Sequence, residues 1–225
     1  MNALDLYKKN GGEAYHSKKH FEDDKTVSLI SKFRAKKFQP YILPNDKVLE
    51  YGVGAGWNLR NIKCSEKLGF DVATALKPLV EKYDIKFTNN PAEIPEAYFD
   101  VVICHHVLEH VPNPLETLKE LKLYMKPGSK LLLFVPTDSA PRFNKYHPGN
   151  KDHHLFNWNV QSLCTLALES GLSLIEYKRN LYGFDRFVSS WISKLGLPAF
   201  FFYPVFYFLN LLSPDREIKV VCTKA

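Results

Sequence analysis

Short apolar runs alternate with segments of helical spacing along most of the chain. In residues 20–39, Val27, Ile30 and Phe33 recur every three positions, which predicts a helix with one apolar face. Further helices are predicted at 56–68, 76–83, 113–125 and 159–171. Strands are predicted at 47–51, 69–73, 84–88, 99–105, 129–136, 172–179 and 217–224.

The order of these elements predicts an α/β fold. Strands that alternate with helices form βαβ units, in which a parallel sheet is covered on both faces. The runs VVIC (101–104) and LLLF (131–134) are apolar without alternation, as expected for strands buried on both sides. We therefore expect one domain over 1–225, with ligands at the carboxyl ends of the strands. An N-terminal helical cap is expected at 1–44, and a hydrophobic lid or insertion at 180–215.

The segment LGLPAFFFYPVFYFLNLL (195–212) carries no charge and seven aromatic residues. Its length alone is that of a membrane-spanning helix. Two features oppose a span: Pro198 and Pro204 are expected to break the run into shorter helices, and the strand at 217–224 must return to the sheet beside 172–179. Two interpretations stay open. The segment is a cap on the core or a dimer face, or it is a lid that docks on a membrane or shapes an apolar acceptor pocket.

Charge separates the two ends of the chain from its centre. The 30 Lys and Arg against 24 Asp and Glu give a formal charge of +6. Basic residues outnumber acidic ones by 10 to 6 in 1–47 and by 7 to 3 in 178–225, whereas the centre has 13 against 15. Such flanks suit nucleic acid, an anionic membrane or plain solvent. The four isolated cysteines and the absence of an apolar leader pattern predict a cytoplasmic protein, peripheral to the inner membrane face if the lid docks there.

The stretch VLEYGVGAG (48–56) places a glycine-rich turn directly after a predicted strand. Glycine permits positive φ and lets a ligand approach the backbone closely. The dinucleotide pattern G-x-G-x-x-G is not met, because Trp57 occupies the position of its last glycine. Glu50 at the strand end would repel a pyrophosphate and suits a ligand with a cationic amino-acid part.

Several stretches resemble the class I S-adenosylmethionine (SAM)-dependent methyltransferases, in particular the small bacterial type 11 and type 23 enzymes. VLEYGVGAG is similar to their first motif, GFDVA (69–73) to their second, and 93–136 to their block around strands 4 and 5. The resemblance covers about 15–177 and the last strand. It implies a Rossmann-like seven-stranded sheet of order 3-2-1-4-5-7-6, with strand 7 antiparallel, helices on both faces and an aromatic helical insertion before that strand.

The resemblance also implies a cofactor and the residues that bind it. The cofactor would be SAM, with S-adenosylhomocysteine as product. Asp71 would hold the ribose, His105 would lie near the sulfonium, and Asn90 would replace the acidic residue that often contacts the adenine. The methionine part would be held by Glu50, Gly52, Gly54 and Gly56.

Six of the eight histidines lie between 105 and 154, in stretches that follow predicted strand ends. Imidazole accepts a hydroxyl proton well near pH 7. The candidate bases are His106, His153 and His154, whereas the resemblance implies a structural role for Glu109 and His110. HVLEHV (106–111) is also similar to the E-x-x-E-H stretch with which ubiquinone-pathway O-methyltransferases hold a metal. With a histidine first, that set suits Mg²⁺ poorly, and we predict no metal.

The sequence therefore predicts an O-methyltransferase that acts on a hydroxylated acceptor such as a surface-glycan or lipid-linked sugar. KDHHLFNW (151–158) is similar to a stretch in small bacterial methyltransferases that accompany surface-polysaccharide or lipid biosynthesis. The alternatives are a small acceptor, such as a quinone precursor or secondary metabolite, and a non-catalytic SAM-fold protein that binds a partner through 195–212. ICHHV (103–107) replaces the [DNS]-P-P-[YFW] motif of nucleic-acid methyltransferases, so no nucleic-acid partner is expected. Anionic membrane or a second copy of the chain could contact 195–212.

Overall fold

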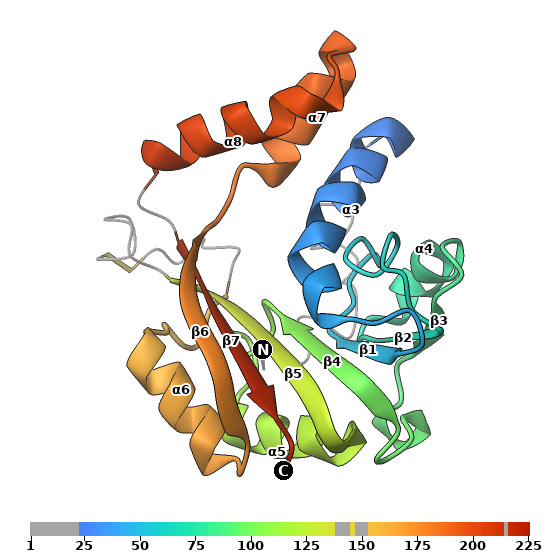
Figure 1. The fold of residues 1–225 in the computed structure, drawn as a ribbon, viewed down its shortest axis with the longest axis vertical. Helices are drawn as coiled ribbons and strands as arrows, with labels where there is room; N and C mark the ends of the chain where they lie inside the picture. The colour runs from blue at the N-terminus through green and yellow to red at the C-terminus, as the bar shows by residue number, and fades with distance from the viewer. Residues whose placement is uncertain (1–22, 138–144, 147–152, 214–215) are drawn as a thin grey trace.

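A seven-stranded sheet organises the protein (Figure 1). The computed structural model describes residues 23–137, 145–146, 153–213 and 216–225. The strand order is β3-β2-β1-β4-β5-β7-β6, as the resemblance implies. The strands are β1 Lys47–Tyr51, β2 Glu66–Phe70, β3 Lys86–Thr88, β4 Phe99–His105, β5 Met125–Thr137, β6 Ser173–Leu181 and β7 Arg216–Thr223.

Strand directions bring the ends of most strands to one edge. The pairs β1–β2, β1–β4, β2–β3 and β4–β5 are parallel, and β7 runs antiparallel to both β5 and β6. Arg216 at the start of β7 pairs with Thr137 at the end of β5 and with Leu181 at the end of β6. The start of β7 therefore lies beside the ends of the other strands. We refer to this side of the sheet as the carboxyl edge.

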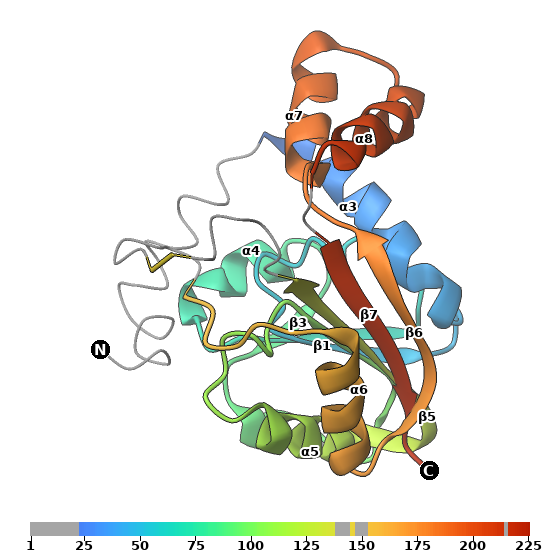
Figure 2. The ribbon, with the colours of Figure 1, turned by 90° about the vertical axis from the view of Figure 1, so that its left-hand side faces the viewer.

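Helices cover both faces of the sheet (Figures 1 and 2). The side chains of β4 alternate between two apolar clusters: Val102 belongs to the cluster beneath α5 and α6, and Ile103 to the cluster beneath α3 and α4. Both faces are thus buried, which explains the unbroken apolar run in the sequence. The helices are α3 Asp24–Phe38, α4 Lys77–Glu81, α5 Pro114–Tyr124, α6 Val160–Glu169, α7 Asp185–Leu195 and α8 Phe202–Leu211.

The helix predicted at 20–39 is confirmed over its described part. Asp23 is the N-cap of α3, and its Oδ1 accepts the backbone N–H groups of Lys25 and Thr26 at 3.0 Å each. Lys36 and Lys37 lie in the last turn, where cations stabilise the partial negative charge of the helix end. The part of the expected 1–44 cap that precedes residue 23 lies outside the described residues.

The predicted helix at 56–68 is wrong, and so is the predicted start of the second strand at 69. Residues 54–61 form turns, and β2 begins at Glu66. Trp57 is buried against α3 beside Ala55, and Asn58 turns inward to bond Glu50. These tertiary contacts oppose a regular helix, whose geometry would turn neighbouring side chains to different faces.

The aromatic segment 195–212 contains α8 and follows directly on α7, and the two helices form a hairpin that projects beyond the carboxyl edge (Figure 2). The predicted break at Pro198 is confirmed, because Gly196 ends α7 with φ +63° and Pro198 precedes the short turn 199–201. The predicted break at Pro204 is wrong. Pro204 occupies the first turn of α8, where its missing N–H removes no helical hydrogen bond.

A membrane span is not among the features of the described chain. Among the described helices, none combines the length and the apolar character that crossing a bilayer requires.

Candidate active site

The glycine-rich turn lies between β1 and the neighbouring strand ends. Gly52, Gly54 and Gly56 all have positive φ, at +80°, +54° and +76°. A Cβ added at Gly52 would lie 2.3 Å from Cγ2 of Val107, so the backbone at Gly52 packs directly against the side chain of Val107, which follows His106. A Cβ at Gly54 would meet nothing within 4 Å, which leaves open space beside the turn. The predicted positive φ of the turn is confirmed, and its contact with a ligand stays a prediction.

Glu50 lies fully buried beneath this turn. Its Oε1 accepts a hydrogen bond of 2.5 Å from Nδ2 of Asn58, whereas Oε2 has no hydrogen-bond partner among the described residues. Burial raises the pKa of Glu50 to about 8, and the bond from Asn58 opposes that rise. A buried acceptor without a donor costs free energy, so the site favours a ligand that brings a cationic donor. The ammonium of a bound amino-acid moiety fits this requirement.

Asp71 follows β2 and closes the same turn. Its Oδ2 accepts the N–H of Gly54 at 2.9 Å, and its Oδ1 accepts the N–H of Ala73 at 3.1 Å. Each carboxylate oxygen has a second lone pair, so the ribose hydroxyls of SAM can still bind. Burial raises the pKa of this carboxyl above its usual range. The residues therefore fit SAM, and Asp71 also stabilises the turn through its bond to Gly54.

Asn90 is the candidate contact for the adenine. It is exposed, and its Oδ1 accepts the N–H of Ala92 at 3.1 Å, capping the short turn Pro91–Glu93. Because the cap uses its oxygen, its NH₂ group is the part that could reach a ring nitrogen. The adenine role of Asn90 stays a prediction.

The raised pKa of Glu50 predicts a pH-dependent affinity for SAM. Since the carboxyl is protonated below its pKa of about 8, SAM affinity should fall with decreasing pH, by up to about tenfold per unit. Isothermal titration calorimetry between pH 6 and 9 measures this. Glu50→Gln should bind weakly with a flat profile, and Glu116→Gln, an exposed residue of α5, should behave as the unaltered protein. Equal slopes for Glu50→Gln and the unaltered protein would contradict the assignment.

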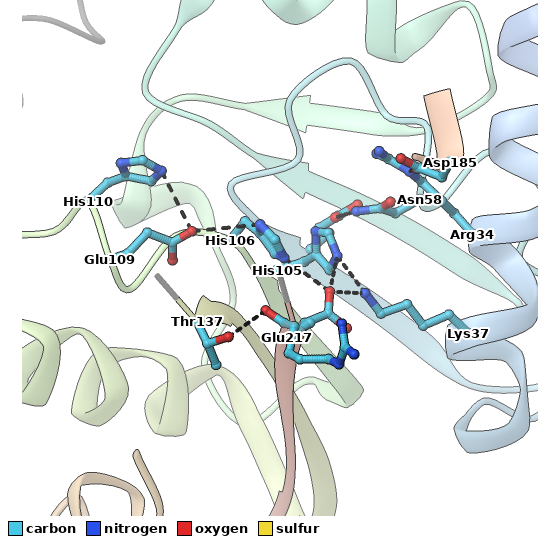
Figure 3. A network of polar contacts seen from close by, with 12 residues as sticks. Arg34, Lys37, Asn58, His105, His106, Glu109, His110, Thr137, Asp185 and Glu217 are labelled. Atoms are coloured by element: carbon cyan, nitrogen blue, oxygen red, sulfur yellow. Dashed lines mark hydrogen bonds and ion pairs between the residues drawn. The ribbon is translucent and has the colours of Figure 1, made fainter. Parts of the chain in front are cut away.

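A polar network connects α3, β4 and β7 at the carboxyl edge (Figure 3). Oε2 of Glu217 is bonded by Nζ of Lys37, lies 3.0 Å from Nε2 of His106, and lies 3.4 Å from Nε2 of His105. The sequence analysis missed Glu217 and Lys37. A carboxylate at the start of the mostly apolar strand EIKVVC (217–222), whose other charged residue is Lys219, was the one available signal.

The network holds the carboxylate of Glu217 ionised and the two neighbouring imidazoles neutral. Burial alone would raise the pKa of Glu217, but Lys37 and the two imidazoles hold it well below its usual range. Burial lowers the pKa of His106, and lowers that of His105 well below its usual range, against the opposing effect of Glu217. Both imidazoles are therefore neutral near pH 7. With Nε2–H of His106 donated to the carboxylate, its Nδ1 is left as a proton acceptor.

His105 and His106 differ in what surrounds them. The ring of His105 packs edge-on against Phe38, and its Nε2 lies 2.8 Å from Nζ of Lys37. His106 has φ +58°, a left-handed conformation that is uncommon outside glycine, and its ring lies 4.7 Å from that of Tyr182. His105 is thus held on the α3 side of the sheet, and its place near a sulfonium stays a prediction.

The second histidine stretch docks beside the first. The N–H of Leu155 donates to the backbone oxygen of Glu109 at 2.7 Å, and the rings of His154 and His110 lie 5.0 Å apart. His106 lies on the other side of Glu109, with its Nδ1 3.8 Å from Oε1 of the Glu109 carboxylate (Figure 3). The structure thus brings two of the three candidate bases, His106 and His154, to one region.

The remaining histidine candidates lie elsewhere. His153 is exposed, with φ +47°, and is the candidate base that the structure leaves facing solvent. His147, in the same sequence cluster, lies outside the described residues.

Among the residues that the structure describes, two groups of side chains could each hold a metal ion. Their ligand atoms lie within 4.8 Å of one another, and the groups differ from the set His106, Glu109 and His110 considered from the sequence. In the group that contains Glu217, the ammonium of Lys37 already pairs with the carboxylate, and its positive charge opposes a metal cation there. The prediction that no metal is required stays a prediction. The groups are His105 with His106 and Glu217, and Glu109 with His110 and His154.

The sequence of the chain matches the model of a known protein family. A family model described as a methyltransferase domain matches residues 20–177. An uncharacterised protein of Methanocaldococcus jannaschii is 28% identical over 138 residues, which are 60% of this chain and 62% of that protein. The match thus spans less than two thirds of that relative.

Solved methyltransferase structures share the fold at low identity. A SAM-dependent methyltransferase of Thermotoga maritima superposes with a TM-score of 0.62 at 16% identity, covering 100% of both chains. A phosphoethanolamine N-methyltransferase of Haemonchus contortus, in complex with phosphomonomethylethanolamine and S-adenosylhomocysteine, gives 0.64 at 14% identity, covering 100% of this chain and 60% of that one. At this identity the likeness extends to the fold alone.

Proposed function

The chain belongs to the methyltransferase domain family, and from this premise we propose that it transfers the methyl group of SAM to a hydroxyl oxygen of its acceptor. The observation that carries the choice of oxygen is a neutral imidazole, His106, oriented by an ionised carboxylate, Glu217, at the carboxyl edge. A neutral amine is already nucleophilic. A hydroxyl group gains far more from a base that takes its proton, so the His106–Glu217 pair favours oxygen.

The chain's own residues bind and orient the reactants. Glu50 would hold the ammonium of the methionine part, Asp71 the ribose, and the backbone at Gly54 would lie against the ligand. Bound SAM supplies a methyl group on a sulfonium, which a nucleophile displaces in line. Alignment of the acceptor with that methyl group is the protein's main contribution to the rate.

His106 would move the proton. As the new C–O bond forms and the C–S bond breaks, the acceptor's hydroxyl proton passes to Nδ1 of His106. Glu217, which accepts from Nε2–H, stabilises the resulting imidazolium. Lys37 keeps Glu217 ionised throughout the neutral pH range, because its ammonium lowers the pKa of that carboxyl.

A hydroxylated sugar, free or lipid-linked, suits the surroundings of His106. The ring of Tyr182 lies 4.7 Å from the imidazole, and an aromatic face there can pack against the apolar face of a sugar ring. Small aromatic acceptors could pack in the same way, and they are the alternative that the experiment must separate.

Transfer of a labelled methyl group tests the proposal. Purified protein is incubated with SAM labelled in its methyl carbon and with an extract that contains unmethylated acceptor, and the lipid, glycan and small-molecule fractions are separated. We expect alkali-stable label in the lipid or glycan fraction, and its loss with His106→Gln. Label confined to small molecules would support the quinone-precursor class. No label in any fraction would contradict the enzyme assignment and favour a binding protein.

We also propose that the α7–α8 hairpin places the protein on the cytoplasmic face of an anionic membrane. Its outer surface exposes large apolar side chains over several turns, and Lys36 and Lys194 lie close by on α3 and α7. Apolar side chains beside cations match the interface of an anionic bilayer. The exposed fractions are 69% for Phe200, 62% for Phe208, 77% for Leu211 and 73% for Leu212.

Co-sedimentation with vesicles checks this placement. The triple variant Phe200→Ser, Phe208→Ser and Leu211→Ser should lose at least about tenfold in affinity for vesicles with 30% anionic lipid. Each substitution removes apolar surface that the membrane would otherwise bury. The matched control replaces three exposed leucines elsewhere by serine, at 43, 123 and 168, and should bind as the unaltered protein. Vesicle binding unaffected by the triple variant, or a dimer in solution that only this variant dissolves, would overturn the placement.

A further inference from the structure

A cavity of about 510 Å³ lies between α3, the end of β6, the α7–α8 hairpin and the start of β7. This volume is in the range of sites for small organic ligands. His105 and Glu217 line its inner end. Since Oε2 of Glu217 is 3.0 Å from Nε2 of His106, the cavity adjoins the base assigned to the methyl acceptor. Residues of both hairpin helices line the cavity, and Figure 2 shows these helices beyond the carboxyl edge.

One wall of the cavity is aromatic. Phe33 of α3 stacks on Phe202 of α8 with ring centroids 3.6 Å apart, and Phe202 stacks on Phe206 at 5.5 Å. Tyr203 packs edge-on against Phe33 at 5.2 Å, and Tyr207 continues the wall toward solvent. Aromatic surface of this extent favours a ligand with an apolar portion several carbon atoms long.

The charged lining is predominantly positive. Five cationic and two anionic residues line the cavity. Both carboxylates are paired, Asp185 with Arg34 at 2.7 Å and Glu217 with Lys37. The cations that form no ion pair within the described part of the chain are Lys36, Lys178 and Arg179.

These three cations come from two sides of the cavity. Lys36 lies on α3 with Nζ 5.1 Å from the ring centroid of Tyr203, so its charge borders the aromatic wall. Lys178 and Arg179 are exposed residues near the end of β6. The charge of Lys178 also lowers the pKa of the Glu176 carboxyl, but none of the three cations forms an ion pair with a described residue. Such cations beside an apolar wall attract an anionic group, and guanidinium and ammonium groups bind phosphate and carboxylate oxygens.

We propose that this cavity binds an anionic amphiphile: a phosphate or carboxylate group joined to a hydrocarbon chain. The chain lies along Phe202, Phe206 and their neighbours, and the anion lies among Lys36, Lys178 and Arg179. Resting on the proposed function, this assigns the acceptor a class, a hydroxylated anionic lipid-like molecule whose hydroxyl reaches His106. Free phosphate shares the anionic group but lacks the chain, and a neutral lipid lacks the charge.

Binding of three probes to the full-length protein loaded with S-adenosylhomocysteine separates these sources. The probes are decyl phosphate below its micelle concentration, decanol and inorganic phosphate, each titrated by calorimetry. We expect decyl phosphate to bind at least about tenfold more tightly than either of the others, because it alone satisfies both the wall and the cations. Equal binding of decanol would remove the anionic part of the proposal. Equal binding of inorganic phosphate would remove the apolar part.

Variants at exposed positions locate the site. Lys178→Gln with Arg179→Gln should weaken decyl phosphate about tenfold and leave decanol unchanged, since charge-assisted hydrogen bonds are lost. Tyr207→Ser should weaken both alkyl ligands. The matched control, Lys63→Gln with Lys77→Gln, removes the same charge at positions outside the cavity lining and should change neither. If the control pair weakened decyl phosphate binding equally, the effect would come from net charge alone, and the assignment of the site to this cavity would be wrong.

Methyl transfer is measured separately, so the two proposals can fail independently. If the protein methylates a hydroxylated acceptor and decyl phosphate neither binds nor competes, the cavity proposal is wrong while the function stands. If decyl phosphate binds with the expected dependence on Lys178 and Arg179 but no acceptor is methylated, the enzyme proposal is wrong while the ligand class of the cavity stands.

Discussion

Replacing Gly52 by alanine is expected to abolish measurable SAM binding and to destabilise the protein by about 2–5 kcal/mol. Gly52 has φ +80°, which an L-residue adopts only at a cost of about 1–2 kcal/mol. The added Cβ would lie 2.3 Å from Cγ2 of Val107, so the turn or the start of the histidine stretch must move. Either movement displaces the backbone that we propose lines the SAM site. Calorimetric titration with SAM and denaturant unfolding measure the two effects.

A second glycine provides the control for backbone strain. Gly128 has φ +75°, and a Cβ there would meet nothing within 4 Å. Gly128→Ala therefore retains the strain without the collision, and should lose about 1–2 kcal/mol of stability with unchanged SAM affinity. If Gly52→Ala bound SAM as well as the Gly128 variant does, the assignment of the turn as the SAM site would be wrong.

Glu217→Gln is expected to lower kcat by about 10²–10⁴-fold, the usual contribution of a positioned acid or base. The substituted amide can donate its NH₂ to Nε2 of His106, which moves the imidazole proton to Nδ1 and removes the acceptor. Glu217 also raises the pKa of His106 against the effect of burial. Its removal therefore lowers that pKa further, and the residual activity should persist to lower pH than in the unaltered protein.

The pH profile separates positioning from a general loss of stability. Glu176 supplies the matched control, because its carboxylate also bonds a lysine, Lys219, at 2.6 Å, without contacting a histidine. Glu176→Gln should leave kcat and its pH dependence unchanged. A lower kcat for Glu217→Gln with an unshifted acidic limb would argue that the carboxylate acts only through the fold.

The sheet and the cofactor turn were largely predictable because their signals are local. Apolar runs such as VVIC (101–104) mark strands buried on both faces, and three glycines after a strand mark a turn that needs positive φ. The order of the motifs, through the resemblance, gave the strand order that the structure confirms. Glu50 and Asp71 were identified in the same way, and their bonds to the turn support their expected place in it.

The helix predicted over 56–68 failed for the opposite reason. Its sequence is compatible with a helix, but Trp57 is buried against α3 and Asn58 bonds the buried Glu50. Burial of a large aromatic ring and a buried hydrogen bond outweigh the small differences in helix propensity between residues. Local pattern could not foresee either contact.

By itself the sequence determined the α/β class and the conformation of the glycine-rich turn, because each depends on residues that are neighbours in the chain, and the resemblance to a known family supplied the strand order. The tertiary structure decided which polar side chains meet at the carboxyl edge. The antiparallel return of β7 brings Glu217 to His106, 111 residues away, and α3 brings Lys37 to the same carboxylate from 180 residues away. The cavity likewise combines side chains of α3, β6, α8 and β7. Contacts of such sequence separation exist only once the sheet and its covering helices have packed.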